Sequence, residues 1–288
     1  MIYRRCANDE FQKKYRWITP LLSEHHAFPE RRMPMSAEGD VDLLVHDRFF
    51  RCLRSGTMLE IGAARPDWLS IGAHFRGLGW DVLSVEPNPH FAALHRNAGH
   101  DVAEVALASA DCDSAIFTIV DCGGQIYRNG QVSYESFSSL GFRGKFAELS
   151  IPDRRQQICV RVCRADTLLN EARPDWKHID LITVDIEGWE IEALSGLDFE
   201  RYQPRVVILE NLFAESAPRS FMRERGYVLW RSRFPNEIFA RAEELSVNER
   251  VAACVYTAFS TFFRRLRIGT ARLYRNRKCR KRSRGDRL

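Results

Sequence analysis

The sequence predicts an α/β protein built on a doubly wound, mostly parallel sheet. From residue 57 onward, short apolar runs alternate with segments of helical periodicity, which is the pattern of repeated βαβ units. Three of the runs lead into segments that carry an acid: LEIG (59–62), VEPNP (85–89) and VDIEG (184–188). Because ligands bind at the carboxyl ends of strands in such sheets, we expect these three segments to meet at one edge.

We expect a seven-stranded sheet with additional segments before and after it, and eight apolar runs are candidates for its strands. We expect strands from the apolar runs at 57–62, 81–86, 102–106, 115–120, 158–162, 179–185, 206–210 and 227–231. We expect helices at 41–53, 68–78, 91–98, 166–172, 189–194 and 217–225. The chain then divides into a helical N-terminal arm (1–55), one ligand-binding domain (56–240), and a C-terminal helix with a basic tail (241–288).

The composition is that of an ordinary globular protein. The 288 residues are 45% hydrophobic and 28% charged, which suits one main domain with a good core. No apolar stretch has the length of a signal peptide core or a membrane span, so we expect residence in the cytosol. The 8 cysteines form no CxxC pair, so neither a zinc site nor a disulfide framework is indicated.

The positive charge is concentrated at the C-terminus. Residues 264–288 hold twelve Lys or Arg and one acid, so the rest of the chain carries a net charge of −6 within the total of +5. The apolar run 251–263 comes just before this tail. Together they could contact an anionic membrane surface from the cytosolic side, form a packing helix with a solvated tail, or attract RNA phosphates.

The first acidic segment, LEIGAARPDW (59–68), suits a ligand without a pyrophosphate. Gly62 allows close backbone approach, and Pro66 suits the first position of a helix. A dinucleotide fingerprint needs further glycines where Ala64 and Pro66 stand. S-adenosylmethionine fits better, because its ammonium can pair with Glu60 while its carboxylate meets helix N–H groups.

The second segment supplies an acid for a ribose. Glu86 ends an apparent strand 26 positions beyond Glu60, a separation at which an acid accepts hydrogen bonds from ribose hydroxyls. We therefore predict S-adenosylmethionine as the cofactor. The predicted cofactor-binding residues are Glu60, Gly62, Ala63, Ala64, Glu86, Pro87, Asn88, Ala106 and Asp185.

The third segment supplies the candidate catalytic residues, Asp185 and Glu187, at the end of a strongly apolar strand. Methylation of a hydroxyl needs a base that takes the proton as the new bond forms, and such assistance contributes roughly 10²- to 10⁴-fold. Either carboxylate could be that base, or could bind the methionine ammonium or orient the acceptor. Acids and glycine are also common in plain turns.

Histidines are weaker candidates. His178 precedes the strand that ends at Asp185, so it belongs at the opposite edge of the sheet. His90 and His95 follow VEPNP on a helix, where packing or contact with an adenine is expected. His25 and His26 lie in the N-terminal arm and are expected to be solvated.

We predict a site without a metal, with one alternative. Glu210 and Asn211 end the next strand and, together with Asp185, could chelate magnesium through oxygen atoms. The Gly- and Ser-rich stretch 121–157 is expected to form part of a lid that faces the substrate, or a mobile insertion without a catalytic role.

With these motifs in place, the chain resembles the FkbM family of S-adenosylmethionine-dependent methyltransferases from about residue 58 to 231. The resemblance lies in Glu60–Ala63, Glu86–Pro89 with Leu94 and Asn97, Ser138–Leu140, Thr167–Leu168, and Asp185–Glu190, in that order. It implies the Rossmann-like fold of class I methyltransferases and O-methylation of a sugar, lipopolysaccharide or polyketide-type hydroxyl. The family commonly has a glycine where this chain has Pro66.

Two other functions compete with O-methylation. The basic tail would suit an RNA methyltransferase, but the Asn/Asp-Pro-Pro-aromatic motif that accepts an exocyclic amine is absent after the strand that ends at Asp185. We therefore expect no specific nucleic acid partner. A non-catalytic adenosyl-binding protein of the same fold is the second alternative, against which the acids Glu60, Glu86 and Asp185 argue.

Overall fold

The computed structural model describes residues 37–120, 126–127, 132–133, 138–148 and 155–256. Several expectations fall outside these residues: most of the N-terminal arm with His25 and His26, parts of the stretch 121–157, and the basic tail.

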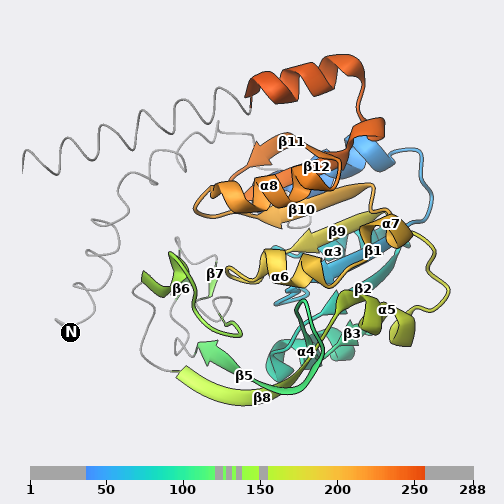
Figure 1. The fold of residues 1–288 in the computed structure, drawn as a ribbon. Coiled ribbons are helices and arrows are strands. Elements are labelled where there is room, and N and C mark those ends of the chain that lie inside the picture. The colour runs from blue at the N-terminus through green and yellow to red at the C-terminus, as the bar shows by residue number, and fades with distance from the viewer. Residues whose placement is uncertain (1–36, 121–125, 128–131, 134–137, 149–154, 257–288) are drawn as a thin grey trace, which may run out of the picture.

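A seven-stranded sheet forms the centre of the described structure (Figure 1). Its strand order is β11-β12-β10-β9-β1-β2-β3. The strands are β1 (Thr57–Ile61), β2 (Asp81–Val85), β3 (Val102–Ala103), β9 (Leu181–Val184), β10 (Val206–Glu210), β11 (Tyr227–Arg233) and β12 (Asn236–Arg241). Strand β12 runs antiparallel to both neighbours, and the other pairs are parallel. The predicted doubly wound α/β fold is confirmed.

The register of the sheet brings the strand ends level with one another. Ile61 lies opposite Val85 of β2 and Val184 of β9, and Leu209 of β10 lies opposite Val184. The segments after β1, β2, β9 and β10 therefore leave the sheet side by side.

Helices cover both faces of the sheet because successive residues of its strands point to opposite sides. Leu59, Leu83 and Ile182 pack in one core cluster, while Met58 and Val82 pack in another. The first face carries α5 (Ala165–Ala172), α6 (Glu190–Ser195), α7 (Phe199–Tyr202) and α8 (Ser216–Glu224). The second carries α2 (Val41–Val45), the π-helical turn η3 (His46–Phe50) and α3 (Ile71–Gly77), while α4 (Pro89–Asn97) packs beside β3.

Two predicted strands lie outside the main sheet, which corrects the expected parallel series. A separate three-stranded sheet contains β4 (Ala106–Leu107), β5 (Cys112–Val120) and β8 (Arg155–Cys163). Strands β5 and β8 pair antiparallel. Burial alternates along them, since Phe117 and Val160 are buried while Ile116 and Cys159 are exposed, which is typical of strands with one buried face. A short hairpin, β6 (Ile126–Tyr127) with β7 (Val132–Ser133), completes the described strands.

Strand β12 is the element that the sequence analysis missed. Its first residues, Asn236 and Glu237, are polar, so they interrupt the apolar pattern. Both are buried in the structure. Arg219 donates from Nε to Glu237 Oε1 at 2.8 Å, and Asn211 donates to Glu237 Oε2 at 3.1 Å. Glu237 can therefore be buried at the start of this strand, because side chains from distant segments donate hydrogen bonds to it.

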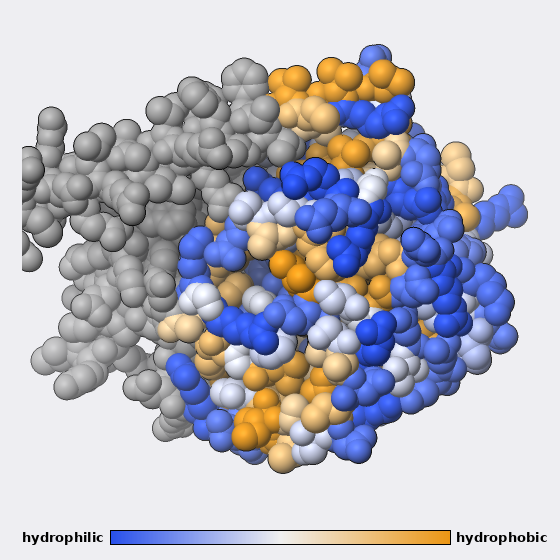
Figure 2. Space-filling model, viewed as in Figure 1, coloured by the Kyte–Doolittle hydropathy of each residue, from blue (hydrophilic) through white to orange (hydrophobic). Residues whose placement is uncertain are grey.

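The C-terminal part of the described chain is a helix over residues 247–256 that follows the 3₁₀ turn η6 (Ala242–Glu244). Arg48 of η3 binds Glu249 at 2.7 Å and ties this helix to the domain. Val247, Val251 and Val255 are exposed along it, at the top of Figure 2. Among the described helices, none has the length and apolar character needed to cross a bilayer. Membrane contact through the tail stays a prediction.

Candidate functional site

The ends of β1 and β9 approach so closely that only glycine fits between them. Gly62 has φ +80°, and a Cβ there would lie 1.9 Å from the carbonyl oxygen of Asp185. The N–H of Asp185 donates to the carbonyl of Ile61 at 3.0 Å, and the N–H of Gly62 donates to that of Val85 at 2.9 Å. The segments that follow β1, β2 and β9 are therefore held together by backbone hydrogen bonds.

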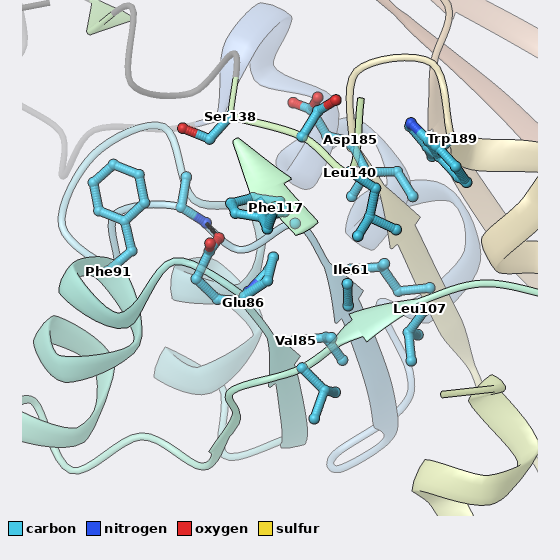
Figure 3. Close-up of a pocket in the computed structure, with 17 residues that line it drawn as sticks. Ile61, Val85, Glu86, Phe91, Leu107, Phe117, Ser138, Leu140, Asp185 and Trp189 are labelled. Atoms are coloured by element: carbon cyan, nitrogen blue, oxygen red, sulfur yellow. Dashed lines mark hydrogen bonds between the residues drawn. The ribbon is translucent and has the colours of Figure 1, made fainter. Parts of the chain in front are cut away.

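A cleft opens at this edge, between the main sheet and the small β4-β8-β5 sheet (Figure 3). The space between its walls, including the part open to solvent, is about 630 Å³. Its lining is largely apolar: Ile61, Gly62, Ala64, Val85, Glu86, Pro87, Phe91, Val105, Ala106, Leu107, Phe117, Ser138, Ser139, Leu140, Asp185, Ile186 and Trp189. Such a cleft suits a ligand with a flat apolar part and a few polar groups.

Glu86 is the acid on one side of the cleft. Its carboxylate accepts the N–H of Ala64 on Oε2 and the N–H of Asn88 on Oε1, both at 2.8 Å. Burial raises the pKa of Glu86 to about 7, although these two hydrogen bonds act in the opposite direction. With both oxygens fixed by backbone donors, the remaining lone pairs are held ready for hydroxyl donors in the cleft.

The turn that supports Glu86 is itself braced by a histidine. Ala64 adopts φ +45°, and its carbonyl lies 3.2 Å from Nε2 of the buried His95. Burial lowers the pKa of His95, which favours the neutral ring with its proton on Nε2. His95 thus packs against the turn, as expected, while His178 lies near Thr57 at the opposite edge of the sheet.

Glu60 points away from the cleft, toward α3. Alternation along β1 turns it to the second face, where Ser70 Oγ and the Gly72 N–H donate to Oε1 at 3.0 and 2.8 Å. Arg76 and Ser84 donate to Oε2, at 2.6 and 3.0 Å. Burial by itself would raise the pKa of Glu60, but the Arg76 guanidinium outweighs it and holds the pKa below its usual value. This position does not support the predicted contact with a cofactor ammonium.

The predicted helix start at Pro66 is wrong. Helix α3 begins at Ile71, and Ser70 caps it by accepting the N–H of Ala73 at 3.1 Å. Residues 65–69 form a turn instead, in which Arg65 pairs with Asp67 at 2.8 Å and Leu69 adopts φ +54°. The N-terminus of α3 is therefore directed at Glu60 rather than at the cleft.

Carboxylates gather on the other side of the cleft, after β9 and β10. One side-chain oxygen each of Asp185, Glu187 and Glu210 lies within 4.8 Å of the others. Asp185 faces the cleft and is the exposed member, whereas Glu187 is only 5% exposed. Burial raises the pKa of Glu187 and Glu210, and it raises that of the neighbouring Glu190 to about 7.

Asn211, the third candidate ligand for magnesium, does not join this group. Its amide nitrogen donates to the carbonyl of Glu215 at 3.0 Å and to Glu237, and its oxygen accepts the N–H of Glu215 at 2.7 Å. The side chain that completes the acidic group is Glu187 instead.

The described part of the predicted lid covers the acidic side of the cleft. Ser139 pairs with Thr118 of β5 through two backbone hydrogen bonds of 2.9 and 3.0 Å. Trp189 donates from Nε1 to the carbonyl of Gly141 at 2.8 Å, and the Arg143 guanidinium lies 3.2 Å from the centre of the Trp189 ring. This segment thereby links the small sheet to the turn that carries Glu187.

The structure places six of the predicted cofactor residues on the cleft wall: Gly62, Ala64, Glu86, Pro87, Ala106 and Asp185. Glu60, Ala63 and Asn88 lie behind it, where Asn88 caps α4 by accepting the N–H of His90. Sequence reasoning missed Phe91, Leu107 and Phe117 as wall residues. The alternation in β5 marks Phe117 as facing inward, but which space it faces depends on where the small sheet docks.

The sequence is similar to those of known methyltransferases. Residues 60–229 match the family model described as "Methyltransferase FkbM domain". A curated protein of Jannaschia sp. (strain CCS1) named "Putative methyltransferase" is 26% identical over 190 residues, which is 60% of this chain. The chain spans 62% of the length of that relative.

The Glu60–Arg76 pair generates a prediction about stability. Arg76→Met should lower the free energy of unfolding by about 3–5 kcal/mol, because it leaves Glu60 buried without its cation. Chemical denaturation measures this loss. Arg65→Met, which breaks an exposed pair, should cost less than about 1 kcal/mol. Equal losses in the two variants would contradict a compensating role for Arg76, and adding Glu60→Gln to Arg76→Met should restore part of the stability.

Glu86 generates a prediction about pH. Its pKa is about 7 in the folded chain against the ordinary 4.5, so the fold favours the protonated acid. That contribution is complete below pH 4.5 and is lost as the pH rises through 7. The unfolding free energy of the wild type relative to Glu86→Gln should therefore fall by about 3 kcal/mol from about pH 4 to pH 8.

The slope with pH is the quantity to compare, because a glutamine nitrogen cannot accept the second backbone N–H and lowers stability at every pH. Parallel curves for the two proteins would show that folding does not shift the pKa of Glu86.

Proposed function

This chain belongs to the FkbM family of methyltransferases, and we propose that it transfers a methyl group from S-adenosylmethionine to a hydroxyl oxygen of a sugar, glycan or polyketide-type small molecule. One observation carries the proposal: Glu86, fixed by two backbone N–H groups, and Asp185 line opposite parts of one apolar cleft. Glu86 can accept hydrogen bonds from the ribose hydroxyls of a nucleoside. Asp185 can accept the proton that the acceptor hydroxyl loses.

The cleft fits an adenosyl group at its Glu86 end. Phe91, Leu107 and Phe117 offer apolar surface to a flat base, and Glu86 lies at the end of β2, where an acid accepts both hydroxyls of a ribose. Gly62 itself adds no side chain to this part of the wall. The turn after β1 lacks the glycines that a pyrophosphate would need, which favours a nucleoside without phosphates.

S-adenosylmethionine supplies an electrophilic methyl group on a sulfonium centre. The residues of this chain then have to orient an acceptor hydroxyl in line with that methyl and take up its proton. Asp185 is the acid of its group that faces the cleft, so we assign it the contact with the hydroxyl.

The walls of the cleft favour a small or carbohydrate acceptor over RNA. Phe91 and Phe117 are 3% and 4% exposed, so they are recessed in the cleft and form no open stacking surface. Ser138 adds a hydroxyl group near Asp185. A recessed cleft with polar groups at its Asp185 end matches an acceptor that carries several hydroxyls.

A binding measurement tests the cofactor assignment. Isothermal calorimetry should detect S-adenosylmethionine and its demethylated product, and Glu86→Ala should weaken both by about 100-fold, because two hydrogen bonds to a carboxylate are lost. Asp113→Ala, an exposed acid on β5 away from the cleft wall, should bind like the wild type. Absence of heat with the wild-type chain would remove the cofactor from the proposal.

Asp185 has its own kinetic prediction. Asp185→Asn should lower kcat by roughly 10²- to 10⁴-fold, while the affinity for the demethylated cofactor changes far less. Labelled S-adenosylmethionine supplied with a cell-envelope glycan extract, and separately with RNA, identifies the acceptor class for this assay. Label in RNA alone would overturn the glycan assignment, and a normal kcat in Asp185→Asn would exclude Asp185 as the base.

A further inference from the structure

We propose that Asp185, Glu187 and Glu210 bind one divalent metal ion of the oxygen-preferring class, magnesium in the first place, in the wall of the cleft. The three side chains come from the ends of two neighbouring strands, β9 and β10. One oxygen of each lies within 4.8 Å of the others, so a single small cation can reach all three.

Two buried oxygens at this point have no hydrogen-bond partner. They are Oε2 of Glu187 and Oε2 of Glu210. Glu187 is 5% exposed, so water cannot solvate its carboxylate freely. Burial of a carboxylate without a partner is costly, and proteins normally pair such groups or use them as metal ligands. The unpartnered oxygens therefore indicate that Glu187 and Glu210 serve as metal ligands, because acids with a purely structural role would be paired.

No basic side chain compensates these acids within the described residues. Asp185, Glu187 and Glu210 form no ion pair there, in contrast to Glu60 with Arg76. The basic residues on the covering segment are directed elsewhere. Arg143 binds Glu192 and stacks on the Trp189 ring, and Lys145 pairs with Glu215 at 3.2 Å.

The ligand chemistry selects a hard cation. All three ligands are carboxylates, with no histidine or cysteine in the group, which suits magnesium, manganese or calcium better than zinc. Oxygens on opposite sides of a magnesium ion are about 4.2 Å apart, from bond lengths of about 2.1 Å. The observed spread of up to 4.8 Å needs only a small side-chain contraction.

The turn after β9 fixes one of the ligands. Glu187 adopts φ +57° and Gly188 φ +97°, and the Gly188 N–H donates to Glu190 at 2.8 Å. A Cβ on Gly188 would lie 3.0 Å from the Phe146 ring, so this turn is tightly covered. Glu187 is thus directed inward by a backbone conformation that leaves its side chain little freedom.

The metal would also bear on the reaction, a consequence that rests on the proposed function. Magnesium usually keeps several coordination positions for water or substrate. Because Asp185 lines the cleft, these positions would be open to the cleft. A hydroxyl bound there becomes more acidic, and the second oxygen of Asp185 can accept its proton. This favours acceptors that offer the metal an oxygen beside the methylated hydroxyl.

Manganese serves as the probe. The full-length chain, stripped by a chelator and free of any methyl donor, is titrated with Mn²⁺ while electron paramagnetic resonance measures the free ion. We expect one Mn²⁺ per chain, displaced by Mg²⁺. Glu187→Gln and Glu210→Gln should each weaken binding about tenfold or more, and Mg²⁺ should raise the melting temperature of the wild type only.

Glu192→Gln is the matched control, because it removes the same charge from α6 outside the acidic group and should leave Mn²⁺ binding unchanged. A wild-type chain that binds no Mn²⁺ at millimolar concentration overturns the proposal, as do glutamine variants that bind it as tightly as the wild type. The wild-type titration decides the matter even where a variant fails to fold.

The metal test is independent of the cofactor test. A chain that binds Mn²⁺ but not S-adenosylmethionine would refute the proposed function and leave the metal site in place. A chain that binds S-adenosylmethionine but not Mn²⁺ would refute the metal site and leave the proposed function in place.

Discussion

The contact between the backbone at Gly62 and the carbonyl of Asp185 determines how the whole site is assembled. A side chain at position 62 would overlap that carbonyl, with its Cβ only 1.9 Å from the oxygen. Because glycine stands there, the segments after β1 and β9 can both turn out of the sheet at the same point. The segment after β2 joins them through the Ala64–Glu86 hydrogen bond, so three loops form one wall.

Burial of acids is the main electrostatic feature of this wall, and the structure handles it in two ways. Glu60 is compensated inside the protein by Arg76 and by donors from α3, so its role is to hold β1 against that helix. Among the described residues, no basic side chain pairs with Glu86 or with the group of Asp185, Glu187 and Glu210, and burial raises the pKa of Glu86, Glu187 and Glu210. Buried acids that remain uncompensated are typical of sites that await a ligand.

The small sheet and the segment 138–148 complete the site from outside the central fold. Phe117 and Leu107 bring apolar surface to the Glu86 end, and Leu140 with Trp189 closes the Asp185 end. The hydrogen bond from Trp189 to Gly141 joins this cover to the turn that directs Glu187 inward. The cover of the cleft therefore comes from segments other than the strand ends that hold the acids.

The sequence by itself determined the doubly wound fold, the location of the cleft at the carboxyl ends of the strands, and the position of Gly62, Glu86 and Asp185 at that edge, because periodicity and strand-end motifs are local signals. Only the tertiary structure decided that Glu60 faces Arg76, that Glu187 rather than Asn211 joins Asp185 and Glu210, and that β5 and β8 leave the main sheet. The direction of a side chain and its partners depends on residues far away in the chain. A buried acid next to an arginine and a buried acid without one look the same in sequence.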